Sequence, residues 1–236
     1  MKLRSILLSA LVAVSVSVFL FMMITGSESI PASATAQPKV PIPKVLVDAG
    51  HGGEDGGAIG VDGVIEKDIN LDIALSVADM LRLCGVEVSM TRSDDSDLSE
   101  EGTTIKERKY SDMSNRLSLY NAKGTAVLSI HQNRFTDKSA RGAQVFYSTN
   151  NEHGSLLASS IRNSVRQLLQ PDNEREIKPA GSNIFLLKNT ENPAVIVECG
   201  FISNPEECAM LCDGSYRREM SFAVTTGFMD YIHSDK

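Results

Sequence analysis

Three stretches of the chain consist almost entirely of apolar residues, without the alternation of a half-buried strand. They cover Val45–Val47, Ala126–Ile130 and Ala194–Val197. Strands of this kind are buried on both faces, as the central strands of a parallel sheet are. Shorter runs predict three further strands. These are Val86–Thr91, Ala143–Tyr147 and Ile184–Leu187.

Segments of helical periodicity separate these strands. Between Glu66 and Cys84, apolar residues recur every three or four positions, and Gly85 then provides a stop signal. The other predicted helices are Ser111–Lys123, Gly154–Leu169, a short helix capped by Asn204 that runs through Leu211, and Ser215–Ile232. Alternation of strands and helices predicts a single α/β domain, with a twisted, mostly parallel or mixed sheet of about six strands and helices on both faces.

The N-terminal segment differs in composition from the rest of the chain. Lys2 and Arg4 precede about twenty uncharged residues, a length that can cross a bilayer. Residues 1–26 are therefore predicted to be a signal peptide or a membrane anchor, with small residues at 34–36 as a cleavage site. Residues 27–43 are rich in Pro, Ala and Ser and predict a flexible linker. In either case residues 44–236 are expected to be exported as one domain.

Charge and cysteine content exclude other classes of function. The 236 residues include 23 Lys and Arg against 30 Asp and Glu, a net charge of −7. This balance does not predict the basic surface that nucleic acid requires. The spacing of the four cysteines fits neither a paired zinc motif nor a dense disulfide framework. We predict four free thiols, with a Cys208–Cys212 bridge as the alternative. The cysteines are Cys84, Cys199, Cys208 and Cys212.

Three of the apolar strands are followed by residues that can do chemistry. His51 lies in a glycine-rich loop after the first strand, His131 follows Ile130, and Glu198 follows Val197. Glu66 begins the helix after the glycine-rich loop. This loop lacks the Gly-Lys-Ser/Thr of a P-loop and the third glycine of a dinucleotide-binding motif. Ligands of α/β sheets bind at the carboxyl ends of strands, so these four side chains are expected to meet there.

Two imidazoles and one carboxylate are the ligand set of many catalytic zinc sites, and the second carboxylate can then serve as a general base. A rival mechanism pairs Cys199 with His131 as a nucleophile, but strand alternation directs Cys199 to the face opposite Glu198. Taken singly, His131 could be a core histidine and Glu66 a carboxylate that favours a helix N-terminus. Asp48 or Asp55 could orient His51 from behind.

Four motifs together resemble the zinc-dependent N-acetylmuramoyl-L-alanine amidases of the Amidase_3 family. They are VDAGHGGEDGGA at 47–58, Glu66, SIHQN at 129–133 and VIVECGFISN at 195–204. The resemblance implies that residues 44–236 form a zinc amidase catalytic domain in which His51, Glu66 and His131 bind one Zn²⁺ and Glu198 is catalytic. The expected reaction cleaves the amide between N-acetylmuramic acid and the L-alanine of the peptidoglycan stem peptide.

One motif departs from the common family pattern. Gln132 follows His131 where alanine is usual, and with GAQVFY at 142–147 this resembles the CwlD-type subgroup of spore-forming bacteria. That resemblance implies a role in spore cortex maturation through muramic δ-lactam formation, which would place the protein in the forespore intermembrane space. Because the exported part is about one catalytic domain long, without room for wall-binding repeats, an accessory protein is expected to position or activate the enzyme, as happens to several members of the family. A membrane contact is expected only through the N-terminal segment.

Two other functions remain open from the sequence. A zinc peptidase could use the same ligands on peptide bonds of the stem, and a wall-binding module could keep the fold without catalysis. Residues that bind the substrate are not predicted.

Overall fold

The structure is a computed structural model that describes residues 43–100 and 102–234. The predicted signal peptide or anchor and nearly all of the predicted linker lie outside the described residues. The first strand begins at Lys44, where the domain was expected to start. Within the described ranges, no helix has both the length and the apolar character needed to cross a membrane.

A mixed sheet of six strands forms the centre of the domain, in the order β2-β1-β3-β6-β4-β5. Strands β1, β2, β3 and β6 run parallel, and β4 pairs antiparallel with β6. This confirms the predicted α/β class. The strands are β1 (Lys44–Ala49), β2 (Glu87–Met90), β3 (Thr125–Asn133), β4 (Gln144–Tyr147), β5 (Lys178–Pro179) and β6 (Ala194–Phe201).

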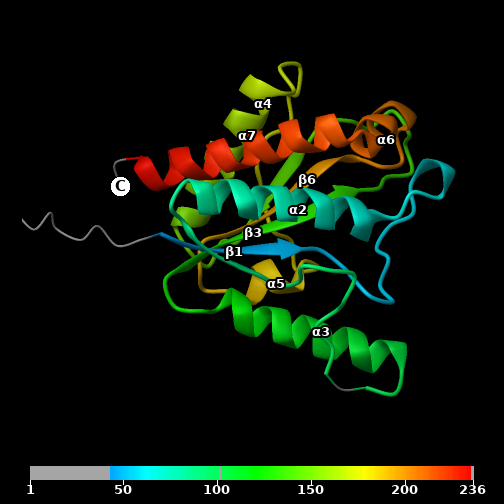
Figure 1. Ribbon diagram of the computed structural model, residues 1–236, viewed down its shortest axis with the longest axis vertical. Helices are drawn as coiled ribbons and strands as arrows, with labels where there is room; N and C mark the ends of the chain where they lie inside the picture. The colour runs from blue at the N-terminus through cyan, green and yellow to red at the C-terminus, as the bar shows by residue number, and fades with distance from the viewer. Residues whose placement is uncertain (1–42, 101, 235–236) are drawn as a thin grey trace, which may run out of the picture. The chain divides into compact units, whose positions relative to one another are not determined.

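Helices cover both faces of the sheet (Figure 1). Side chains alternate between the faces, so that in β1 Val45 and Val47 join the core beneath α2, α4 and α7, whereas Leu46 joins a second cluster beneath α3 and α5. The helices are α2 (Glu66–Leu83), α3 (Ile105–Tyr120), α4 (His153–Leu168), α5 (Phe185–Asn189), α6 (Pro205–Cys212) and α7 (Gly214–His233), with a short 3₁₀ turn, η1 (Val61–Gly63).

The strand predicted at Ile184–Leu187 was wrong. Phe185–Asn189 is the short helix α5, whose Leu186 and Leu187 are buried in the second cluster. A run of four apolar residues cannot distinguish a strand from a buried helical turn. The sixth strand is instead the two-residue β5, which pairs with β4.

Helix α3 begins six residues before its predicted start at Ser111. The side chain of Thr104 accepts a hydrogen bond from the Glu107 amide, and the Glu107 side chain accepts one from the Thr104 amide, so the pair forms a capping box. The first turns contain few apolar residues, and periodicity therefore missed them. Helix α3 also ends at Tyr120, three residues before its predicted end at Lys123. The boundaries of the other predicted helices agree with the sequence within one residue, and Asn204 caps α6 as predicted.

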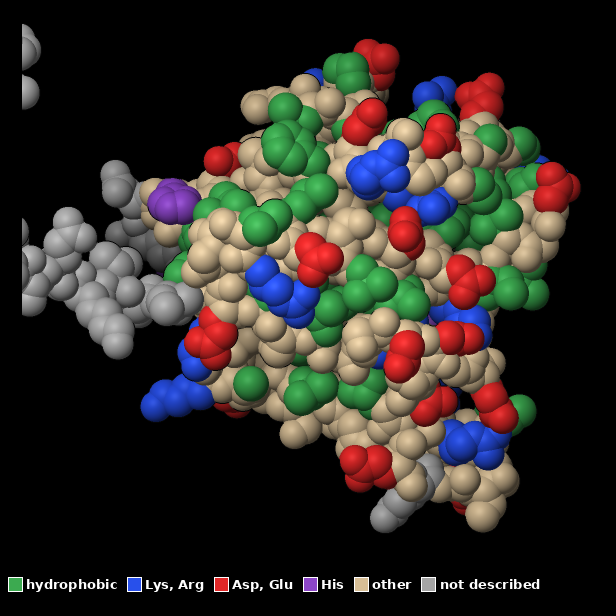
Figure 2. Space-filling model, in the orientation of Figure 1, with side chains coloured by type: hydrophobic (Ala, Val, Ile, Leu, Met, Phe, Trp, Pro, Cys, Tyr) green, Lys and Arg blue, Asp and Glu red, His purple; other side chains and the backbone are tan. Residues whose placement is uncertain are grey.

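Acidic and basic side chains are interspersed on the face shown in Figure 2, without a basic patch over its described residues. All four cysteines are free thiols, as predicted, with Cys199 and Cys208 buried.

Candidate active site

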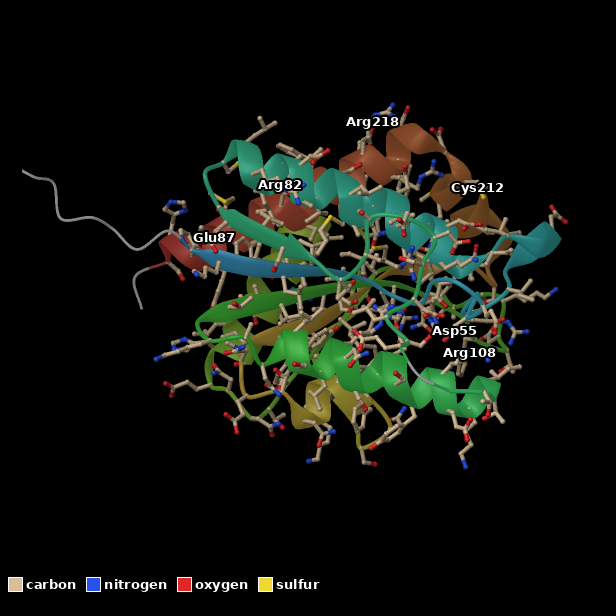
Figure 3. All side chains as sticks on the ribbon, turned by 60° about the horizontal axis from the view of Figure 1, so that its bottom comes forward. Asp55, Arg82, Glu87, Arg108, Cys212 and Arg218 are labelled. Atoms are coloured by element: carbon tan, nitrogen blue, oxygen red, sulfur yellow. The ribbon has the colours of Figure 1, made fainter. Side chains whose placement is uncertain are left out.

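The four residues singled out in the sequence lie together at the carboxyl ends of the parallel strands. His51 follows β1 after one intervening residue, Gly50, and Glu66 is the first residue of α2. His131 of β3 lies beside Glu198 of β6, because the two are register partners in neighbouring strands. Figure 3 shows this edge through Asp55 and Arg108, with Glu87 at the opposite end of the sheet.

His51, Glu66 and His131 offer three ligand atoms that all lie within 4.8 Å of one another. The Nε2 atom of His51 is 3.3 Å from Oε2 of Glu66, and Nδ1 of His131 is 3.0 Å from Oε1 of the same carboxylate. The two rings are 5.0 Å apart in an edge-to-face arrangement. Neutral imidazoles and one carboxylate are ligands that zinc prefers, so this donor set fits a divalent cation.

Opposing effects set the ionisation of these ligands. Burial raises the pKa of Glu66, but hydrogen bonds and the charges of His131 and His51 outweigh it and hold the pKa well below its usual range. Burial lowers the pKa of His51, but hydrogen bonds to Asp55 and Glu66 and the charges of these carboxylates outweigh burial and raise the pKa to about 9. Glu66 is therefore an anion, and the raised pKa of His51 favours a positively charged imidazole beside it. A bound cation can supply that positive charge instead.

Glu198 is partly buried, and one of its carboxylate oxygens is cut off from solvent. Its Oε2 atom is shielded from solvent and has no hydrogen-bond partner among the described residues. Burial raises the pKa of Glu198 to about 7, and the nearby His131 charge opposes that rise without cancelling it. A buried carboxylate oxygen without a hydrogen-bond partner lowers the stability of the fold. Such atoms therefore often mark catalytic sites, where substrate, water or an ion supplies the partner. The carboxylate is thus available to exchange a proton near neutral pH.

Comparison with known proteins places this constellation in a family. Residues 45–230 match the family model described as N-acetylmuramoyl-L-alanine amidase, Amidase_3. The chain belongs to this family. It is an N-acetylmuramoyl-L-alanine amidase that acts on peptidoglycan.

Individual relatives agree with this assignment. The amidase is 34% identical to the germination-specific N-acetylmuramoyl-L-alanine amidase of Bacillus subtilis, over 80% of this chain and 79% of the relative. The structure of the Clostridioides difficile CwlD amidase, solved in complex with the GerS lipoprotein, matches with a TM-score of 0.78 and 34% identity, over 82% of this chain and 100% of that one. The AmiC2 amidase of Nostoc punctiforme matches with a TM-score of 0.64 and 29% identity, over 80% and 96%. These similarities support the CwlD-like character predicted from the motifs.

The glycines of the β1–α2 loop make room for the side chains of the site itself. A Cβ atom on Gly50 would lie 2.3 Å from ring atoms of His131, and one on Gly57 would lie 2.6 Å from both Glu66 and His51. Real Cβ contacts are never so short. The loop can therefore pass between the ligands only because glycine occupies these positions.

Of the two acids considered behind His51, Asp55 contacts its ring directly. Oδ2 of Asp55 lies 3.1 Å from Nδ1 of His51, and Oδ1 accepts a hydrogen bond from the Gly57 amide. A carboxylate on the second ring nitrogen fixes the tautomer and the orientation of a ligand histidine. Lys109 lies 3.2 Å from the same carboxylate and holds it from the side of α3.

Asp48 does not reach the His51 ring and instead lies in a buried polar network. It accepts hydrogen bonds from Tyr120 and Ser129, each at 2.6 Å, and pairs with Arg116. Burial raises the pKa of Asp48, but Arg116 and the two hydroxyl groups outweigh burial and lower the pKa to about 2.

Asp48→Asn is expected to lower the free energy of unfolding by about 3 kcal/mol at neutral pH, because it removes one of the two carboxylates that pair with the buried guanidinium of Arg116. A depressed carboxyl pKa stabilises the fold above the unfolded pKa, and that stabilisation is lost as pH falls through the folded pKa. The difference between wild type and variant should therefore shrink as pH falls from about 4 towards 2. Urea denaturation at a series of pH values measures this, and a constant difference would contradict it.

Cys199 faces away from the site. It is fully buried in the core beneath α2, α4 and α7, on the face opposite Glu198. Burial raises the pKa of its thiol well above the usual range. The nucleophile mechanism that paired Cys199 with His131 was therefore wrong.

Asn70, which the sequence did not single out, and Gln132, whose structural role the sequence did not show, form a hydrogen-bond network around Glu66. The Nδ2 atom of Asn70 donates to the carbonyl of Gly50 and lies 3.3 Å from Oε1 of Glu66, and the Nε2 atom of Gln132 donates to Oδ1 of Asn70. The main-chain amides of Gln132 and Ala58 also donate to the carboxylate. The unusual glutamine at 132 was the only sequence signal for this network.

A cleft beside the site could admit substrate. A cavity of about 230 Å³ runs from His131 between α3 and the segment before α5, where Met113, Ile184 and Phe185 form apolar walls. A second cavity, of about 130 Å³, continues past His51 and Asp55 along α3. A larger cavity, of about 530 Å³, lies between the loops before β4 and after α4 and includes none of the four site residues.

Proposed function

We propose that this amidase is zinc-dependent and holds one zinc ion through His51, Glu66 and His131. The observation that carries the proposal is the convergence of these three ligand atoms within 4.8 Å beside Glu198, whose shielded Oε2 atom has no hydrogen-bond partner among the described residues. A bound zinc ion supplies a Lewis acid that polarises the scissile carbonyl and makes an attacking water more acidic. The residues of the chain then perform the proton transfers and hold the geometry.

Glu198 is proposed as the general base and then the general acid. Its raised pKa lets it take a proton from the attacking water at neutral pH. The same proton then goes to the nitrogen of L-alanine as the amide bond breaks, so the leaving group departs as a neutral amine. Asp55 keeps the His51 ring oriented while this occurs, and Glu66 remains an anion throughout.

Spore cortex is the proposed substrate within peptidoglycan. The support is the germination-specific B. subtilis relative, together with Gln132 and the GAQVFY motif. An amidase releases the intact stem peptide with a free L-alanine amino group and leaves muramic acid without a peptide, the state from which a δ-lactam can form. A peptidase would leave L-alanine attached to the glycan.

Removal of zinc is expected to abolish the release of stem peptide, and added Zn²⁺ is expected to restore it. Binding should also raise the free energy of unfolding by about 2.7 kcal/mol when free zinc is 100 times its dissociation constant. Mass spectrometry of digested cortex and denaturation with and without zinc are the measurements. His131→Ala should lose both effects, whereas His233→Ala, a change at an exposed histidine of α7, should keep them. Full activity of zinc-free protein would refute the proposal.

Export and an accessory partner are proposed as well. Residues 1–26 have the composition of a signal peptide or anchor, and 27–43 that of a linker. The structure of the C. difficile CwlD amidase was solved in complex with the GerS lipoprotein. This supports the proposal that the present amidase also has an accessory protein. If the purified amidase digested cortex at the same rate with and without extracts of its own sporulating cells, the partner proposal would fail.

A further inference from the structure

Two arginines hold the backbone that carries His51. The carbonyl groups of Ala49, Gly50 and His51 are consecutive, and each accepts hydrogen bonds from a guanidinium group. Arg92, which follows β2, donates to Ala49 at 3.0 Å and to Gly50 at 3.1 Å. Arg116, on α3, donates to Ala49 at 3.2 Å and to His51 at 2.8 Å. The loop is therefore clamped from two neighbouring elements.

The backbone at His51 needs such support. Its φ angle is +63°, in the left-handed region that non-glycine residues rarely adopt. This conformation costs about 1–2 kcal/mol for a residue with a Cβ atom. Strained residues persist where the surroundings determine their conformation, and the hydrogen bond from Arg116 to the His51 carbonyl fixes the peptide plane that follows the strained residue.

Both guanidinium groups are buried and fully engaged. Arg92 is 4% exposed and Arg116 is 3% exposed. Arg116 also pairs with Asp48 and Asp112, which orient it. Burying a charge is unfavourable unless hydrogen bonds compensate it, so both side chains are held in a single geometry by their partners.

Arg92 is the more unusual of the two. Within the described part of the chain, each hydrogen bond that it donates ends on a main-chain carbonyl, and the further acceptors are Lys67 and Asp94. Its side chain also packs against Gly52, where a Cβ atom would lie 2.9 Å from Cδ of Arg92. The β1–α2 loop can therefore pack against Arg92 only with glycine at position 52.

We infer that Arg92 and Arg116 are positioning residues, which present the His51 imidazole to the cation by fixing the carbonyls of Ala49, Gly50 and His51. The inference rests on the proposed zinc site. A lysine keeps the positive charge but has no planar fork, so it cannot bridge two carbonyls in the same way. Substitution by lysine therefore removes the clamp without changing the electrostatic repulsion that a cation would feel.

The test measures zinc affinity in Arg92→Lys and Arg116→Lys by competition with a chromophoric chelator, together with kcat and KM at saturating zinc. Loss of a group that orients a metal ligand costs about 10–100-fold in affinity, and we expect that loss in both variants. We also expect a lower kcat with KM within about twofold of wild type, because the clamp acts on the ligand and not on the substrate.

Arg217→Lys is the matched control. Arg217 also donates to two consecutive carbonyls, those of Leu211 and Cys212, and pairs with Asp72, but it lies on α7 away from the site. This variant should lose stability and keep its zinc affinity. A structural role alone would make all three lysine variants behave alike.

The outcomes separate this inference from the proposed function. Zinc affinities within twofold of wild type in both site variants would overturn the clamp and leave the zinc site standing. A wild-type protein that binds no zinc would overturn the proposed function itself. If Arg116→Lys does not fold because of its pair with Asp48, Arg92→Lys decides, since it breaks no carboxylate contact in the described residues.

Discussion

Glu198→Gln is expected to reduce kcat for cleavage of the muramoyl–L-alanine amide by about 10³-fold or more, because glutamine can neither accept nor return the proton. The substitution keeps the size of the side chain, so the fold and the zinc content should be unchanged. The measurement is release of stem peptide from cortex muropeptides, with metal analysis of the same sample. Full activity in this variant would remove Glu198 from the mechanism.

The ionisation of Glu198 adds a second, independent readout. A carboxyl group with a raised pKa destabilises the folded state at pH values above its unfolded pKa, and the destabilisation is complete above the folded pKa of about 7. Glu198→Gln should therefore raise the stability of the zinc-free protein at pH 8, by about 1–3 kcal/mol. In the wild type, kcat/KM should fall as pH drops through the pKa of Glu198, and bound zinc should move that limb to lower pH.

Glu207→Gln is the control for this experiment. Glu207 is a buried glutamate whose pKa is likewise raised by burial, but it accepts hydrogen bonds from Gly142 and Phe201 and lies outside the cluster of four site residues. Its substitution should lower stability without a large effect on kcat. Equal losses of activity in both variants would indicate a general disturbance of β6 and not a catalytic role.

Gly50→Ala adds a single methyl group and is expected to disrupt the zinc site. The added Cβ would lie 2.3 Å from two ring atoms of His131, so either the ring or the loop must move. A ligand histidine displaced by as little as 1 Å no longer meets the geometry of a tetrahedral site. We expect zinc affinity to fall by about 100-fold or more and activity to fall with it.

Two alanine variants separate this collision from ordinary effects of glycine replacement. At Gly214 an added Cβ meets nothing closer than 3.5 Å, so Gly214→Ala should be silent. Gly85 has a φ of +82° with open space around it, so Gly85→Ala should cost stability through backbone strain and leave zinc binding unchanged. Zinc binding by Gly50→Ala at wild-type affinity would show that the loop accommodates the methyl group.

The central strands could be predicted because burial on both faces leaves a direct trace in the sequence. Val45–Val47 and Ala194–Val197 lie where the apolar runs placed them, in β1 and β6. The hydrophobic pattern was a weaker guide to short elements and to polar helix turns. Four apolar residues at Ile184–Leu187 fitted a strand and a helical turn equally well, and only their packing against the sheet made them helical. The polar first turns of α3 carried no periodicity at all.

The four site residues could be predicted because strand ends gather at one edge of a parallel sheet. His131 and Glu198 directly follow apolar runs that were predicted as strands and that lie in β3 and β6. Arg92, Arg116 and Asn70 could not be found in this way, since their importance depends on which carbonyl each one reaches. That choice is made by tertiary packing, and no local pattern of residues encodes it.

The direction of β1 also bears on how the enzyme meets its substrate. Lys44 begins the strand and pairs with Glu87 at the amino end of the sheet, so the preceding chain joins the domain about 20 Å from the catalytic edge. Helix α7 ends on the same side (Figure 1). Both ends of the described chain therefore lie at the edge of the sheet opposite the catalytic residues.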